Sequence, residues 1–559
     1  MITLKSRVVR LLIGIGFFSV LSFGQTALTK TGNLVFHETA SDVMMNALQT
    51  QPEQSFLRKL YTQTFFVPIW IEKDGPSSMS RELFERIKTD NTLNKTGKLY
   101  QDTLALEEKM NELYASGAGI SQKVNLEFKL SQLYKGYADY TLYGSINWGA
   151  FQARLSNLRV HAITAGWITH KPTVSPLQLI ENATSRGSLE TAFNQAEPNK
   201  YRYKALKKEL NKYVAIKENG GWLPVPLKST LKPEESHASV PSIRERLRAT
   251  GDYKTCEEGT EGLLYDACLK KAVIHFQNRN GLVAKGKIEK TTRVALNKTV
   301  EEHIATMKIN LDRIKWLNER NSKRHVIINI PAFRLYFEED DKLRQTMKVI
   351  VGKRKNPTPV FSNSVKTIVL NPYWNVPKSI IQKEMIPKLM RNPDAMARKG
   401  IEIRSGWGKD SQEINVSSVD WSQYRNSKSM PFRFAQVPGT RNALGKVKFL
   451  FPNQFAVYMH DTPTKKLFNR NVRAFSHGCI RLQKPRELLK TFSTFNDTVN
   501  FDKSQRILKG KRRTYLSLDS TVPVDVVYLT AWVDYNGTLQ FRNDVYGYDK
   551  MQISSSRKW

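Results

Sequence analysis

The chain has 559 residues, several times the ~100–150 residues of a typical domain, so we expect two to four domains. Hydrophobic residues make up 40% and aromatic residues 10% of the sequence, which excludes a wholly disordered chain and a collagen-like repeat. The 87 Lys and Arg residues against 51 Asp and Glu give a net charge of +36. This charge predicts attraction to a polyanion, which could be nucleic acid, anionic lipid or an acidic cell-wall polymer.

The first 24 residues have the pattern of a secretory signal. Lys5, Arg7 and Arg10 precede an apolar run over 11–23, and small residues follow. At ~1.5 Å per residue this run spans ~20 Å, short of the ~30 Å hydrocarbon core of a membrane. We therefore expect an exported, periplasmic protein with no stable membrane span after cleavage, or a membrane-tethered one if the signal is retained. Export argues against nucleic acid as a partner.

Residues 25–235 are predicted to form a helical scaffold region. Leu126, Leu130, Leu133, Tyr134 and Tyr137 recur at spacings of three and four, which indicates one buried helix face. No compact cluster of catalytic residue types occurs here, and glycines and prolines near its end are typical of a linker.

A compact helical unit is expected over 236–300, followed by a connecting helix over 301–322. Thr291 is a plausible N-cap of one helix in this unit. Cys256 and Cys268 are close enough in sequence to form a disulfide in an oxidising compartment, and two unpaired buried thiols are the alternative. Cys479 is then left without a partner.

From residue 323 the apolar pattern changes to the alternation of strands, as at Val326, Ile328 and Ile330. We predict a mostly-β domain over 323–500 with a helical capping insertion at about 378–442, where the strand pattern lapses. Residues 501–559 are expected to form an extension that packs on this domain or on the scaffold. The predicted fold class is therefore multidomain α+β.

One short segment carries the residue types of a cysteine nucleophile. If residues 477–481 are extended, His477, Cys479 and Arg481 share one face of a strand. An imidazole can take the thiol proton and a cation favours the thiolate, while Gly478 lets a substrate approach the backbone. There are two alternatives. Cys479 could be a small buried cysteine, or His460, His477 and Cys479 could be zinc ligands, although a fourth ligand is missing.

The string SHGCIRL at 476–482, with His460 lying 17 residues before His477, resembles the signature of the L,D-transpeptidase (YkuD) catalytic domain. Further segments that resemble the family lie at 371–380, 438–453 and 458–463. The unit at 236–300 resembles a peptidoglycan-binding module, and the flanking helices resemble the scaffold of large periplasmic members. The resemblance implies a YkuD-like sandwich for the mostly-β domain.

The resemblance also implies a role for each matching position. Cys479 would be the nucleophile and His477 its base, with the main-chain carbonyl of Ser476 orienting the imidazole. Gly478 and Cys479 would supply backbone donors to the oxyanion. His460 and Arg481 match substrate-side positions of the family. Tyr458 and Trp374 would line the pocket.

The implied reaction is acyl transfer through a cysteine thioester. The thiolate would cleave a peptidoglycan stem tetrapeptide, release D-alanine, and pass the acyl group to the amine of a second stem, giving a 3→3 cross-link. Neither a metal nor an organic cofactor is implied, and the partners are donor and acceptor stems, with other cell-wall synthesis proteins as further candidates. Two alternatives stay open: a hydrolase on the same fold, such as an L,D-carboxypeptidase or an enzyme that detaches wall-linked proteins, and a non-catalytic wall-binding protein.

Overall fold

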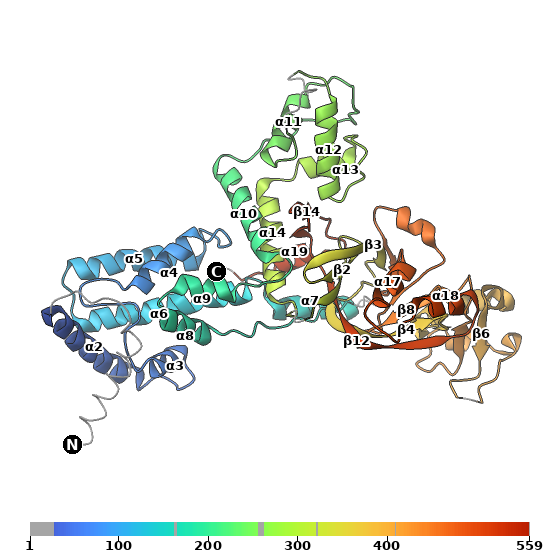
Figure 1. Cartoon of the computed structure of the whole chain (residues 1–559), viewed down its shortest axis with the longest axis horizontal. Helices are drawn as coiled ribbons and strands as arrows, with labels where there is room; N and C mark the ends of the chain where they lie inside the picture. Colours follow the sequence, from blue (N-terminus) through green and yellow to red (C-terminus); the bar gives the residue numbers. More distant parts are fainter. Residues whose placement is uncertain (1–26, 161–164, 255–261, 320–321, 409, 558–559) are drawn as a thin grey trace.

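The computed structural model describes residues 27–160, 165–254, 262–319, 322–408 and 410–557. Figure 1 shows scaffold helices at one end of the molecule, a large sheet at the other, and a small helical unit standing away from both. None of the helices in these ranges is long and apolar enough to cross a membrane. The predicted signal at 1–24 lies outside the described residues.

The scaffold is a helical layer with its own apolar core, as predicted. Its longest helix, α6 (Ile120–Tyr143), buries the face that the sequence indicated. A carboxylate, Glu127, is also fully buried there and accepts hydrogen bonds from the Tyr61 hydroxyl and from three consecutive backbone amides of residues 69–71, at 2.6–3.1 Å. The remaining scaffold helices are α2 (Ala27–Leu48), α3 (Phe56–Gln63), α4 (Ser78–Thr89), α5 (Lys98–Ala115), α8 (Pro176–Arg186) and α9 (Leu189–Ala196).

Two packed helices, α10 (Tyr203–Glu218) and α14 (Val300–Lys315), connect the small helical unit to the rest of the molecule (Figure 1). The unit consists of α11 (Val240–Ala249), α12 (Ala267–Arg279) and α13 (Lys290–Leu296) around a separate apolar core. Cys268 is buried in that core. Cys256 lies outside the described residues, so the disulfide between them stays a prediction.

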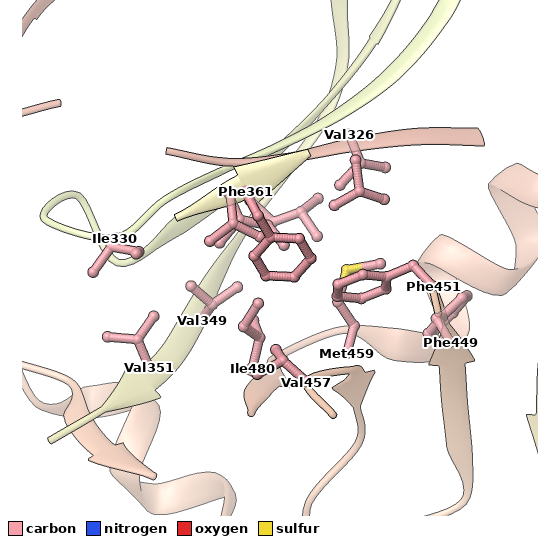
Figure 2. Close-up of a cluster of buried hydrophobic side chains, with 14 of the residues drawn as sticks. Val326, Ile330, Val349, Val351, Phe361, Phe449, Phe451, Val457, Met459 and Ile480 are labelled. Atoms are coloured by element: carbon pink, nitrogen blue, oxygen red, sulfur yellow. The ribbon is translucent and has the colours of Figure 1, made fainter. Parts of the chain in front are cut away.

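The C-terminal half is built on nine strands in the order β10-β3-β11-β9-β8-β4-β12-β1-β2. Because β2 also pairs with β3, the sheet closes into a ring around an apolar core. Figure 2 shows this core, with Val326, Val349, Phe361, Met459 and Ile480 converging from different strands. The strands are β1 (Arg324–Asn329), β2 (Arg334–Glu339), β3 (Lys342–Gly352), β4 (Phe361–Leu370), β8 (Val447–Leu450), β9 (Met459–His460), β10 (Ala474–Ser476), β11 (Ile480–Leu482) and β12 (Thr514–Val527).

Strand β12 corrects the expectation that residues 501–559 are an extension packed on a finished domain. It pairs in parallel with β1, Val326 opposite Val524, and antiparallel with β4. The ring therefore cannot close without it. The tail also contributes β13 (Ala531–Val533), β14 (Leu539–Phe541) and α19 (Tyr548–Ile553), after α17 (Pro485–Phe492) and α18 (Phe501–Lys509).

One segment of the predicted scaffold region packs into the core of the ring instead of the scaffold core. Its buried residues in the core of the ring lie between Ile146 and Trp167. Helix α7 (Trp148–Val160) places Trp148 and Phe151 there. The backbone amide of Ile168 donates to the carbonyl of Val360 at 2.8 Å, just before β4 begins. A cut at residue 235 or 323 would therefore expose apolar surface.

The insertion at 378–442 is called the cap from here on. It was expected to be helical, but it contains strands as well as helical turns. It contains α15 (Lys378–Ile380), a π-helical turn η1 (Ile381–Met385), α16 (Ile386–Leu389) and 3₁₀ turns including η3 (Ala397–Lys399). A three-stranded sheet, β5-β7-β6, joins it to the ring through β5 (Trp374–Asn375), with β6 (Ile401–Arg404) and β7 (Arg433–Gln436). The cap has an apolar core of its own, which includes Ile386, Trp421 and Phe434.

Candidate active site

Residues 477–479 form a bend between two strands, which corrects the expectation of one extended segment. Strand β10 runs parallel to β3 and β11 runs antiparallel to it, so the chain must reverse direction between Ser476 and Ile480. Gly478 makes the reversal with φ +114°, a conformation that favours glycine. His477 and Cys479 therefore do not share a strand face, and their side chains meet different neighbours.

The Ser476 side chain braces this bend. Its Oγ accepts the Gly478 amide at 3.1 Å and donates to the Cys479 carbonyl at 2.6 Å. Its main-chain carbonyl accepts the amide of Lys353 at 3.0 Å. The Ser476 carbonyl keeps a second lone pair, so its predicted hydrogen bond to the His477 imidazole stays a prediction. The Gly478 amide is bonded within the bend, and its predicted role toward an oxyanion stays a prediction as well.

The Cys479 thiol lies against the loop that leads into β9. Its Sγ is 3.9 Å from the Ala456 carbonyl oxygen, and both the backbone and the side chain of Tyr458 form hydrogen bonds with it. Burial raises the pKa of Cys479 above its ordinary value, while Tyr458 and the charges of Lys448 and Arg481 act in the opposite direction. The resting group is therefore a thiol that needs a base.

His460 is the second histidine of the site, and it is buried. It is 4% exposed, and the parallel pairing of β9 with β11 sets it opposite Arg481, two residues from Cys479. Its Nδ1 is 2.5 Å from the carbonyl oxygen of Asp461, and the imidazole also forms a hydrogen bond with the backbone of Leu444. Burial, followed by the charge of Arg481, lowers the pKa of His460 to about 3. The imidazole is therefore neutral near pH 7, and so low a pKa makes it a weak proton acceptor for a thiol.

His477 faces the cap instead. Its Nε2 is 2.7 Å from Oε1 of Glu384 on η1 and 3.5 Å from Nζ of Lys353, and 34% of its side chain is exposed. Among the described residues, no hydrogen bond joins its ring to the Cys479 thiol. Sequence reasoning missed Glu384, since an acid inside an insertion has no motif; only the position of the insertion gave a signal.

The remaining predicted residues lie on two sides of the site. The Tyr458 ring packs against His460, with centroids 5.6 Å apart, and Lys448 Nζ lies 3.7 Å above its centre. Arg481 is partly buried beside His460. Trp374, in contrast, lines a separate pocket of about 320 Å³ that the cap forms with the ring.

Comparisons with known proteins identify the family. Residues 323–501 match the family model of the L,D-transpeptidase catalytic domain (YkuD), and residues 55–210 match that of the Scaffold domain. The chain therefore contains a region similar to the L,D-transpeptidase catalytic domain, preceded by a region similar to the Scaffold domain. That family implies an enzyme of the cysteine acyltransferase type with a peptidoglycan-related function.

Individual relatives agree with this assignment. A Haemophilus influenzae protein named "Putative L,D-transpeptidase" is 32% identical over 237 residues, which is 42% of this chain and 46% of that protein. The chain thus spans about half the length of this curated relative. Among solved structures, an L,D-transpeptidase from Mycobacterium smegmatis is 13% identical (37% of this chain, 58% of that chain, TM-score 0.18). One from Stackebrandtia nassauensis is 14% identical (53% and 97%, TM-score 0.21).

Proposed function

We propose that this protein is a peptidoglycan L,D-transpeptidase that forms 3→3 cross-links between stem peptides. Cys479 is the nucleophile, and the donor is a stem tetrapeptide that loses D-alanine. The observation that carries the proposal is the bend that presents Cys479 two residues after His477, whose Nε2 is 2.7 Å from Oε1 of Glu384. His477 is the proposed general base, because its imidazole is oriented by an acidic partner at the bend that carries the thiol.

The first half of the reaction forms the thioester. The thiol gives its proton to the imidazole of His477 as sulfur attacks the carbonyl carbon between the third and fourth stem residues. The amide C–N bond breaks, and the imidazolium returns the proton to the departing D-alanine amine. Glu384, 2.7 Å from Nε2 of His477, stabilises the imidazolium while it holds the proton. The Tyr458 hydrogen bonds favour the thiolate as it forms.

The second half consumes the thioester. The side-chain amine of an acceptor stem attacks the carbonyl carbon, the C–S bond breaks, and His477 carries the amine proton back to sulfur. One amide replaces another, so no ATP is needed. The Cys479 amide, next to the bend, is the backbone donor proposed for the oxyanion in both halves.

The rest of the chain fits an exported wall enzyme. We propose that residues 1–24 direct export and that the unit at 236–300 binds peptidoglycan, with the net charge of +36 favouring an acidic polymer. Donor and acceptor stems are the proposed partners.

The test is incubation of the purified full-length protein with tetrapeptide muropeptides, followed by separation of the products. Cross-linked dimers and free D-alanine are expected, and Cys479→Ala should yield neither while keeping the thermal unfolding temperature of the parent. Tripeptides without dimers would assign the chain to the hydrolases instead. Turnover that survives in Cys479→Ala would refute the nucleophile.

A further inference from the structure

The pocket of about 320 Å³ under the cap is lined by apolar, polar and charged side chains. Four of the lining residues are cations, contributed by α16, by η3 and by the loop after β7: Lys388, Arg398, Lys399 and Arg441. In the described part of the chain, none of the four forms an ion pair. Burial and the charge of Lys388 lower the pKa of Lys399, which shows that the two ammonium groups are held near each other. Such a cluster is stabilised by a bound anion.

The acid that lines the pocket neutralises these cations only in part, because its charge raises the pKa of Lys399 less than burial and Lys388 lower it. Glu384 directs its Oε1 to His477 at 2.7 Å. The pocket is therefore polarised, with one carboxylate toward the Cys479 bend and a cluster of cations toward the cap. An anion entering the pocket is repelled at the Glu384 side and attracted at the other.

The cationic wall is held in place by a buried side chain. Gln436 is 6% exposed; its Nε2 donates to the carbonyls of Lys399 and Arg441, at 2.8 and 3.1 Å, and its Oε1 accepts the Ala443 amide at 2.8 Å. The Arg441 guanidinium in turn donates to the Arg398 carbonyl at 3.1 Å. These bonds join two segments that are far apart in sequence, so the pocket is formed before any ligand arrives.

We propose that this pocket is a carboxylate-binding subsite of the enzyme, which holds a free carboxylate of the stem peptide while the acyl group reacts at Cys479. The inference rests on the proposed function for the identity of the peptide. Guanidinium and ammonium groups bind carboxylates through charge-assisted hydrogen bonds, and Arg does so with two parallel donors. Glu384 connects the pocket to the reactive bend, since it lines the one and contacts the other.

A stem tetrapeptide with a diamino acid at position three offers two sources of this chemistry, the C-terminal carboxylate and the side-chain carboxylate of the diamino acid. The experiment uses three synthetic tetrapeptides: one with both groups free, one with the C-terminus amidated and one with the side-chain carboxylate amidated. Binding is measured by isothermal titration calorimetry to the full-length Cys479→Ala protein, which cannot turn them over.

One of the two amides should bind about tenfold more weakly than the free peptide, and which one it is identifies the source. In the double variant Lys388→Gln/Lys399→Gln that difference should shrink to within about twofold. Lys383→Gln is the matched control, because Lys383 is an exposed lysine of η1 that does not line the pocket. Raising the salt to about 1 M should weaken the free peptide selectively, since the Debye length falls to about 3 Å.

Equal affinity for all three peptides, or a double variant that keeps the full difference, would overturn the subsite. Circular dichroism and thermal unfolding establish that the double variant is folded. Failure of the proposed function is a separate result, because it is read from wild-type turnover of muropeptides and not from binding to the Cys479→Ala protein.

Discussion

The inside of the ring and the junction between ring and cap each hold a histidine, under opposite conditions. His460 in the ring is 4% exposed and bonded to a main-chain carbonyl, whereas the side chain of His477 at the junction is 34% exposed and faces a carboxylate. Burial keeps a histidine neutral and makes it a weak proton acceptor. We therefore propose proton transfer for His477 and packing against Tyr458 for His460.

Substitution of the two histidines should separate these roles most strongly. His477→Gln is expected to lower kcat by about 10²–10⁴, the usual contribution of general acid–base catalysis. His460→Gln replaces a buried ring that packs against Tyr458 and should lower kcat by less than about tenfold. Steady-state kinetics of D-alanine release gives both values. A larger loss in His460→Gln than in His477→Gln would reverse the assignment.

Two glutamates allow the effect of burial to be compared through the free energy of unfolding. Glu127 is fully buried in the scaffold, and each of its oxygens accepts two donors, whereas the Glu384 side chain is 44% exposed. Burial raises the pKa of Glu127 to about 7, and the four hydrogen bonds oppose that rise. Glu127→Gln places an amide NH₂ against backbone N–H groups.

We expect Glu127→Gln to cost about 3 kcal/mol of unfolding free energy, because a buried donor pair then loses its acceptor. Glu384→Gln should cost less than about 1 kcal/mol, as exposed ion pairs do. Urea unfolding of the full chain followed by circular dichroism measures both. Equal costs for the two variants would show that burial does not set the difference.

The sequence predicted the order of the parts better than their edges. The helical scaffold core around Leu130 and the strand alternation at Val326 follow from apolar spacing, which is local information. The place of β12 in the sheet could not be predicted, because its partners β1 and β4 are more than a hundred residues away. The length and apolar pattern of β12 fit an edge strand and a central strand of the sheet equally well.

The residues of the site could be predicted from the sequence, whereas the backbone that carries them could not. SHGC and an upstream histidine were enough to select Cys479, His477 and His460. The bend at Gly478 replaces the extended segment that strand periodicity predicted, and it turns His477 toward the cap. The bend depends on the pairing of β10 and β11 with β3, which is a tertiary feature. Glu384 could be found only once the cap was seen to fold back on the bend.

Acid should reveal the buried histidine through stability. An unfolded imidazole binds a proton below about pH 6.5, whereas folded His460 does so only near its pKa of about 3. Between these values the unfolded chain holds more protons, so stability rises with pH across the window and is lost as the pH falls through it. From pH 7 to pH 5 this group alone removes about 2 kcal/mol. We therefore expect the loss of unfolding free energy between pH 7 and pH 5 to be about 2 kcal/mol smaller in His460→Gln than in the wild type, measured by urea unfolding. His477→Gln serves as the exposed counterpart in the same titration. Parallel pH profiles for wild type and His460→Gln would mean that the His460 imidazole takes up a proton in the folded protein within this pH range, and burial would not then hold it neutral.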